Sequence, residues 1–193
     1  HPNLHIIDNS VDFEDKMARA MRAVYECLGE RPPEQHWHKY LIEMPDLAAL
    51  EKTYDAAGVD MMQTYLQKTS PQVVRRVRQQ RNGAEYLYFY TEKHTTPEGE
   101  WETERPISGK EYIQYLMEGD TSLHAVHKTK YRFRCDDQRM ELDVYPFSRD
   151  RAILRAALED GQPLQTPPEI TVLREVTGDA QYKNSNLART QQL

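Results

Sequence analysis

The stretch AVHKTKYRFRCDDQRMELDVY, residues 125–145, decides the expected fold, because it reads as two strands joined by a tight turn. Its charged residues fall on alternate positions: Lys128, Lys130, Arg132, Arg134, Glu141 and Asp143. The residues between them are aromatic or aliphatic: Tyr131, Phe133, Leu142 and Val144. Successive side chains of a strand point to opposite faces, so each strand has one charged and one apolar face. The turn Cys135-Asp136-Asp137-Gln138 implies that the two strands pair in antiparallel fashion.

The same alternation appears in earlier runs that we expect to be strands. The residues that share a face are Arg76 and Arg78 in residues 73–80, and Thr91 and Lys93 in residues 85–93. Asn82-Gly83 separates these two runs and predicts a β-hairpin. Further strands are expected at 35–43, 61–66 and 170–176. Residues 151–160 fit a helix by their alanine content and a strand by their alternation, and we favour the strand.

Three helices are expected, at residues 10–29, 46–57 and 108–118. Gly58 is expected to end the second helix, and Ser108 and Glu111 have the spacing of a capping box at the start of the third. Glu30-Arg31-Pro32-Pro33 interrupts the helical pattern and predicts a linker. We therefore divide the chain into residues 1–33 and a main domain of residues 34–190. The polar tail from Gln181 onward is expected to fray.

The composition excludes several classes of protein. A formal net charge of −6 argues against general nucleic-acid binding, which needs a surplus of Lys and Arg. Two cysteines, Cys27 and Cys135, supply neither a disulfide framework nor metal-ligand spacing, which fits a reducing compartment such as the cytoplasm. No apolar run approaches the roughly 20 residues that span a bilayer, and no signal-like segment opens the chain. Peripheral membrane contact stays open.

Taken together, the alternating strands predict an α+β fold in which a closed antiparallel β-barrel of about eight strands carries flanking helices. Any one charged pair also fits an ordinary sheet with a solvated face. Several strands that all alternate charge with aromatic residues favour a barrel with a charged lumen. Arg and Lys in such a lumen can neutralise phosphate oxygens, and carboxylates can hold a bridging divalent cation.

The chain resembles the CYTH, or triphosphate tunnel, family between about residues 35 and 190. The motifs that carry the resemblance occur in the family's order: Lys39-Tyr40-Leu41-Ile42, Gln63-Thr64-Tyr65-Leu66, Arg76-Val77-Arg78, Thr91-Glu92-Lys93, Lys128-Thr129-Lys130-Tyr131, Glu141-Leu142-Asp143 and Glu175-Val176-Thr177-Gly178-Asp179. The resemblance implies a tunnel whose phosphate-binding residues are Lys39, Arg76, Arg78, Lys93, Arg105, Lys128, Lys130, Arg132 and Lys183. It also implies weak binding of Mg²⁺ or Mn²⁺ by Glu141, Asp143 and Glu159.

The chain departs from the family where the family carries metal-binding acids. The family opens with Glu-x-Glu-x-Lys, but the aligned stretch here is Gln35-His36-Trp37-His38-Lys39. A late Glu-x-Glu becomes either Arg155 and Ala157 or Ala157 and Glu159. We therefore interpret the domain as a module that binds a nucleoside triphosphate such as GTP, a polyphosphate or a phosphoinositide headgroup without turnover. The alternative is a Mg²⁺- or Mn²⁺-dependent triphosphatase that acts on inorganic, thiamine or nucleoside triphosphate.

The start of the chain shows a second resemblance. His1-Pro2-Asn3-Leu4 and Ile7-Asp8-Asn9-Ser10 resemble the end of a P-loop, kinase-like AAA domain, as found in proteins of the TRPL translocation defect type that join this domain to a CYTH domain. The resemblance implies that residues 1–33 are the helical remnant of a P-loop domain in the same full-length chain. It also implies GTP or phosphoinositide as ligand. No Walker motif is present in the sequence.

Overall fold

The computed structural model describes residues 35–97 and 99–193. Its main compact unit comprises Trp37–Leu158 and Pro163–Leu193, and the remaining described residues belong to a second unit. The predicted helix at 10–29, the predicted linker and Cys27 lie outside the described residues. The description below concerns the main unit.

Nine strands form one mostly antiparallel sheet, and three α-helices accompany it within the described residues, so the α+β class is confirmed. The strands are β1 (Gln35–Glu43), β2 (Gly58–Tyr65), β3 (Val73–Asn82), β4 (Glu85–Thr96), β5 (Gly99–Ile107), β6 (Val126–Cys135), β7 (Gln138–Val144), β8 (Arg151–Glu159) and β9 (Val172–Glu175). The helices are α2 (Leu47–Tyr54), α3 (Gly109–Leu116) and α4 (Asn184–Thr190), with a 3-10 turn η1 at Ala180–Tyr182.

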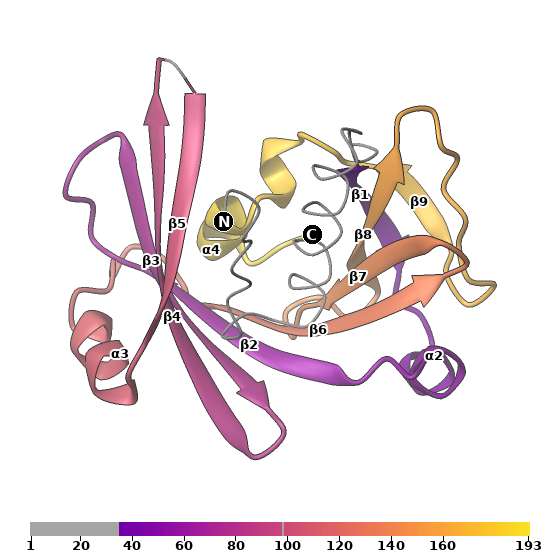
Figure 1. The fold of residues 1–193 in the computed structure, drawn as a ribbon, viewed down its shortest axis with the longest axis horizontal. Coiled ribbons are helices and arrows are strands. Elements are labelled where there is room, and N and C mark those ends of the chain that lie inside the picture. Colours follow the sequence, from indigo (N-terminus) through magenta and orange to yellow (C-terminus); the bar gives the residue numbers. More distant parts are fainter. Residues whose placement is uncertain (1–34, 98) are drawn as a thin grey trace, which may run out of the picture. The chain divides into compact units, whose positions relative to one another are not determined.

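The predicted closure of a barrel is not confirmed. Along the sheet the strands follow the order β5-β4-β3-β2-β6-β7-β8-β1-β9, and its two end strands, β5 and β9, are not hydrogen-bonded to each other. The sheet is nevertheless strongly curved: β3, β4 and β5 form one side, β8, β1 and β9 form the other, and β2 and β6 connect them (Figure 1). We call the concave side the inner face and the convex side the outer face.

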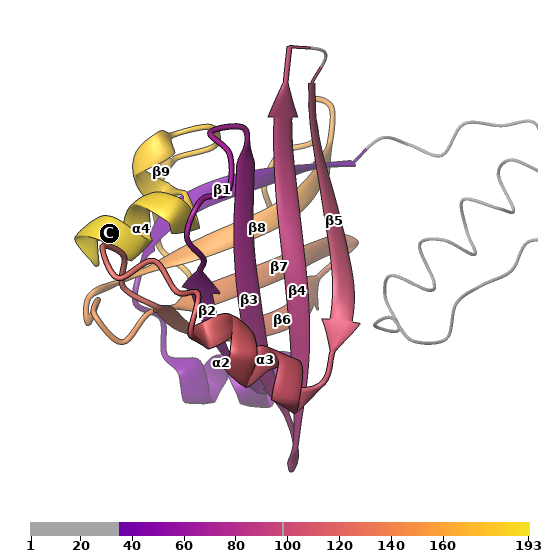
Figure 2. The same ribbon diagram turned by 90° about the vertical axis from the view of Figure 1, so that its left-hand side faces the viewer.

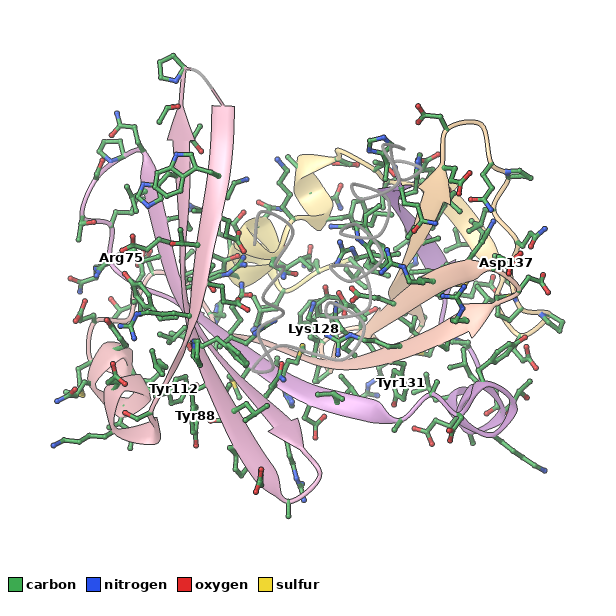
Figure 3. The ribbon with its side chains drawn as sticks, viewed as in Figure 1. Arg75, Tyr88, Tyr112, Lys128, Tyr131 and Asp137 are labelled. Carbon is green, nitrogen blue, oxygen red and sulfur yellow. The ribbon has the colours of Figure 1, made fainter. Side chains whose placement is uncertain are left out.

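The outer face carries apolar clusters on which two helices pack, as the alternation predicts. On β3 and β4, Val77 and Tyr88 pack with Tyr112 of α3, which crosses these strands in Figure 2. On β6 and β7, Tyr131 and Leu142 belong to a larger cluster that includes Leu50 of α2. Figure 3 shows Lys128 on the inner side of β6 and Tyr131 on its outer side, toward α2.

One end of the inner face is closed by an apolar cluster around α4. Leu187 and Ala188 of α4 are fully buried. They pack with Leu41 of β1, Ile153 of β8 and Tyr145, which directly follows β7. The backbone N–H of His124 donates to the carbonyl of Ala188 at 2.7 Å, which ties the helix to the loop before β6. The prediction that the tail frays is therefore wrong for residues 181–190, because the few apolar side chains of this polar segment are all buried.

Local signals in the sequence are largely confirmed. Gly83 adopts a φ of 61° in the β3–β4 hairpin, a conformation that glycine adopts readily. Ser108 and Glu111 form both hydrogen bonds of the capping box on α3. Residues 151–159 form β8, as favoured. Asp46 caps α2, but the helix ends at Tyr54 with Asp55 in the left-handed region, so the expected stop at Gly58 is wrong.

Strand β5 was not predicted from the sequence. Its residues alternate glutamates with Trp101, Thr103 and Arg105 and end near Pro106, a pattern that scores poorly as a strand. Proline is tolerated because β5 lies at the edge of the sheet. Most other strand boundaries move by three residues or fewer, and β9 is shorter than the expected 170–176.

We expect Leu187→Ala to lower the free energy of unfolding by about 2–4 kcal/mol, because it leaves a cavity beneath α4. Urea denaturation followed by circular dichroism measures the change. Ile113→Ala on α3 is the control, since Ile113 is 65% exposed and its loss should change the stability by less than about 0.5 kcal/mol. A Leu187→Ala protein as stable as the control would show that α4 does not pack on the sheet in solution.

Candidate functional site

The inner face gathers most of the predicted phosphate-binding residues. β3 contributes Arg76 and Arg78, β4 contributes Lys93, β6 contributes Lys128, Lys130 and Arg132, and β1 contributes Lys39. Strand β2 lies between β3 and β6 and shows how their cations come together. Its Gln63 pairs with Arg78 of β3, and its Met61, two residues earlier and on the same face, pairs with Lys128 of β6. Residues 50 positions apart in the sequence thus share one surface, as their parity on the strands predicts.

The most deeply buried charges of the inner face lie on β6 and β7. Lys128 donates from Nζ to Oδ2 of Asp143 at 2.6 Å, and the two side chains are only 12% and 5% exposed. Lys130 forms a hydrogen bond to Oε2 of Glu141 and lies 3.7 Å from Oδ1 of Asp143. Burial alone makes isolated charges very unfavourable, so each lysine and each carboxylate here depends on its partners.

A third element completes this network from β8. Arg155 donates from Nη1 to Oε2 of Glu141 at 2.8 Å, and Arg132 Nε lies 3.4 Å from Oε1 of the same carboxylate. Glu141 and Asp143, the predicted metal ligands, are therefore surrounded by cations of this chain. Arg155 also lies over the ring of Trp37, with 4.7 Å from its guanidinium carbon to the ring centroid.

The opposite side of the inner face has its own ion pairs, between β3 and β5. Arg76 donates to Glu102 at 2.7 Å and Arg78 donates to Glu104 at 2.8 Å. Thr91 donates to the second oxygen of Glu104 at 2.9 Å. The side chains of Arg76 and Arg78 are each 25% exposed, so these pairs are more accessible to solvent than the pair of Lys128 and Asp143.

The pKa values follow from burial and from the neighbouring charges. Burial lowers the pKa of Lys128 to about 8 despite the attraction of Asp143. Burial alone would raise the pKa of Asp143, but Lys128 and Lys130 hold it below its ordinary value. The pKa of Glu141 is likewise lowered, with Lys130 and Arg155 outweighing burial. Both carboxylates therefore stay ionised at neutral pH, and their stabilising contribution is lost as the pH falls through their folded-state pKa values.

Lys39 faces the same group of charges from β1. Burial lowers its pKa, and the positive charges of Arg155, Lys183 and Lys130 lower it further. Its Nζ donates to the carbonyl oxygen of Tyr182 at 2.8 Å, a neutral acceptor. Lys39 thus lies where an additional negative charge would be stabilised.

Among the described residues that form or adjoin the ion pairs of the inner face, there are eight cations and four carboxylates. The cations are Lys39, Arg76, Arg78, Lys93, Lys128, Lys130, Arg132 and Arg155, and the carboxylates are Glu102, Glu104, Glu141 and Asp143. Two buried donors, Arg78 Nε and Gln63 Nε2, lack a hydrogen-bond partner among the described residues. Buried donors are normally satisfied, and an excess of positive charge attracts anions. The inner face is therefore suited to an anion with several oxygen atoms.

Two predicted site residues, Arg105 and Lys183, lie outside this group of charges. Arg105 pairs with Tyr90 on the outer face and donates to Glu111 and Tyr115 of α3 at 3.3 and 3.1 Å. Lys183 is exposed and precedes α4, close enough for its charge to act on Lys39. Glu159 is exposed at the end of β8 and belongs to the second unit.

The divalent cation that the resemblance implies does not fit the residues around Glu141 and Asp143. Among the residues that the structure describes, no three His, Cys, Asp or Glu side chains are grouped so that they could hold a metal ion. Asp143 Oδ1 is the one oxygen of these two carboxylates that is buried without a hydrogen bond in the described chain, and Lys130 lies beside it. Mg²⁺ in phosphate-binding sites takes most of its six ligands from water and phosphate but needs one or two accessible carboxylates. Here both carboxylates are already occupied by ammonium or guanidinium groups of the chain.

Sequence reasoning missed four residues of the inner face: Trp37, Glu102, Glu104 and Arg155. Glu102 and Glu104 were missed because β5 was not recognised as a strand, although Glu100, Glu102 and Glu104 have the period of two that a strand requires. Trp37 and Arg155 were noticed only as departures from acidic motifs. Their mutual contact depends on the placement of β1 beside β8, which no local signal reveals.

Two solved structures resemble this chain over most of its length. A crystal structure of the inorganic triphosphatase NE1496 has 26% sequence identity and a TM-score of 0.58, and the match covers 81% of this chain and 95% of the other. A crystal structure described as the hypothetical protein NE1496 has 28% identity and a TM-score of 0.57, with 81% and 98% covered. No family model and no curated protein matches the chain.

The likeness to these structures supports the resemblance to triphosphate tunnel proteins in its broad form. The narrower resemblance to proteins of the TRPL translocation defect type is not tested by it.

We expect Asp143→Asn to lower the free energy of unfolding by about 3 kcal/mol or more, because it leaves the buried charge of Lys128 without its partner. Glu102→Gln is the matched control: it makes the same chemical change in a pair whose side chains are 25% and 40% exposed. Such a pair contributes about 0–1 kcal/mol. Urea unfolding of both variants at neutral pH measures the difference, and equal losses would mean that the pair on β6 and β7 is not specially buried.

Proposed function

We propose that the inner face binds a linear triphosphate, and that hydrolysis of inorganic triphosphate is the reaction to be tested first. The observation that carries the proposal is the excess of cations over carboxylates on the inner face. Phosphate oxygens accept charge-assisted hydrogen bonds from Arg and Lys, and these are the strong hydrogen bonds of proteins. A ligand with phosphates in a row can reach both the arginines of β3 and the lysines of β6.

The comparisons support a triphosphate as the ligand class. The inorganic triphosphatase NE1496 shares 26% identity over 81% of this chain. Its described activity favours the triphosphatase alternative over the interpretation as a binding module without turnover. The engagement of Glu141 and Asp143 by lysines and Arg155 favours binding alone. Phosphate release is therefore the measurement that separates the two.

Roles for the residues follow from their exposure and partners. Arg76 and Arg78 sit in partly exposed ion pairs and can exchange a glutamate for a phosphate oxygen. Lys39 and Lys128 add positive charge at the other side of the face. Fixed cations of this kind also stabilise charge that develops on oxygen during phosphoryl transfer, which is how they would assist hydrolysis.

Other ligands with the same phosphate chemistry belong to the proposal. The triphosphate of GTP, the triphosphate of thiamine and a phosphoinositide headgroup would each satisfy the same cations. In the described part of the chain, no helix is long and apolar enough to cross a membrane. A preceding P-loop domain, a cytoplasmic location and peripheral membrane contact remain proposals from the sequence.

We expect Arg76→Ala and Arg78→Ala each to weaken binding of tripolyphosphate by about 1.5–3 kcal/mol, the range for hydrogen bonds to charged groups. Isothermal titration calorimetry measures the affinity, and release of inorganic phosphate is followed in parallel. Arg81→Ala is the control, because Arg81 also lies on β3 but is exposed and points to the outer face, opposite to Arg76 and Arg78. Unchanged affinity in both inner-face variants, with the fold intact, would rule out this face as the binding site.

Affinity for tripolyphosphate should fall as the pH rises through about 8, because Lys128 then loses its charge. Lys128→Arg should flatten the decline, since a guanidinium keeps its proton throughout this range. Titration of tripolyphosphate itself affects both proteins equally, so it cancels in the ratio of the wild-type affinity to the Lys128→Arg affinity at each pH. If that ratio stays constant across the range, Lys128 does not titrate in the site.

A further inference from the structure

The carboxylates of the inner face that could attract a divalent cation are already neutralised by the chain itself. Asp143 accepts from Lys128 at 2.6 Å. Glu141 accepts from Lys130 and from Arg155, the latter at 2.8 Å, and Arg132 lies 3.4 Å from its second oxygen. A metal ion at either carboxylate would have to displace an ammonium or a guanidinium group. The displaced group would remain partly buried without its partner, which is strongly unfavourable.

Arg155 is held in a fixed position among these groups. Glu141 anchors its guanidinium by one ion pair, and the ring of Trp37 lies against it with 4.7 Å between the ring centroid and the guanidinium carbon. Arg139 lies over the same ring at 5.6 Å. Because the guanidinium is held between a carboxylate and an aromatic ring, Arg155 is a preorganised cation with further N–H donors.

We infer that Arg155, together with Lys128 and Lys130, occupies the place of a divalent metal ion, so that the inner face binds triphosphate without Mg²⁺ or Mn²⁺. This inference rests on the proposed function and specifies the ligand as the free polyanion rather than its metal complex. It makes Arg155 a phosphate-binding residue and Trp37 the residue that positions it.

The charge balance gives the expected direction of the metal effect. A divalent ion that binds triphosphate in solution removes part of the negative charge to which the inner-face cations are complementary. Added Mg²⁺ should therefore leave the affinity unchanged or lower it.

The test is calorimetric titration of the 193-residue protein with inorganic tripolyphosphate at constant ionic strength, once with EDTA and once with excess Mg²⁺. We expect binding in EDTA that is at least as tight as binding with Mg²⁺. Binding that appears only with Mg²⁺, or that tightens about tenfold or more with it, would overturn the inference while the proposed function stands. Absence of binding in both conditions would overturn the proposed function and the inference with it.

Variants of Arg155 test its role directly. Arg155→Glu should weaken metal-free binding at least about tenfold and make the remaining binding increase with Mg²⁺, because it adds a carboxylate beside Glu141. Arg81→Glu makes the same change of charge on an exposed residue of opposite parity to Arg76 and Arg78, and should leave the ratio of affinities in EDTA and Mg²⁺ unchanged.

Folding of each variant is checked by thermal unfolding without ligand. If Arg155→Glu does not fold, Arg155→Gln removes the positive charge without adding an acid and should still lower metal-free affinity about tenfold. Trp37→Phe, which keeps a ring beside the guanidinium, should retain metal-free binding. Wild-type affinity in both folded Arg155 variants would overturn the assignment of Arg155.

Discussion

The ion pair between Lys128 and Asp143 is the contact on which the inner face depends. The two residues lie on adjacent strands with almost no exposure to solvent. Removing a charge from water costs several kcal/mol even after relaxation, so the pair is stable only if further partners surround it. Lys130, Glu141 and Arg155 supply these partners from three neighbouring strands. Register between β6, β7 and β8 is thereby constrained, because a slip by one residue would move every one of these charges to the apolar face.

The division of faces also decides where the curved sheet buries its apolar side chains. The outer face must bury Val77, Tyr131 and Leu142, and α2 and α3 cover them. The inner face cannot be filled with apolar side chains, because its alternate positions carry charge. Only its end is closed, by the cluster beneath α4. The result is a curved sheet whose concave side stays polar and whose hydrophobic burial lies mainly behind it and at one end.

Within the strands that were recognised, period-two alternation predicted which of the charged residues share the inner face, since it is a local property of each strand. Arg76, Arg78, Lys128 and Glu141 were placed correctly on this basis, and the β3–β4 hairpin and the capping box of α3 were equally local. The partners of each charge were not predictable, because they depend on register across strands. Glu104 meets Arg78 through an edge strand with an unfavourable composition, and Arg155 meets Trp37 through strands far apart in the sequence. Likewise, α4 forms because Leu187 and Ala188 find a buried site, although the helix itself is short and polar.

The two sides of the inner face differ in how easily their cations can change partners. Arg76 and Arg78 pair with glutamates that are 40% and 35% exposed, and such pairs contribute little free energy because water solvates the separated charges. A phosphate oxygen can therefore replace either glutamate at small cost, and the released carboxylate remains hydrated. Lys128 and Lys130 cannot exchange in this way, because Asp143 and Glu141 would be left buried and unpaired. For a triphosphate bound as proposed, the arginines of β3 would form direct contacts by exchange, whereas the network of β6, β7 and β8 would act as a fixed charge distribution. A divalent ion would compete with this fixed distribution for the same carboxylates, and the geometry of Arg155 on Trp37 favours the protein's own cations.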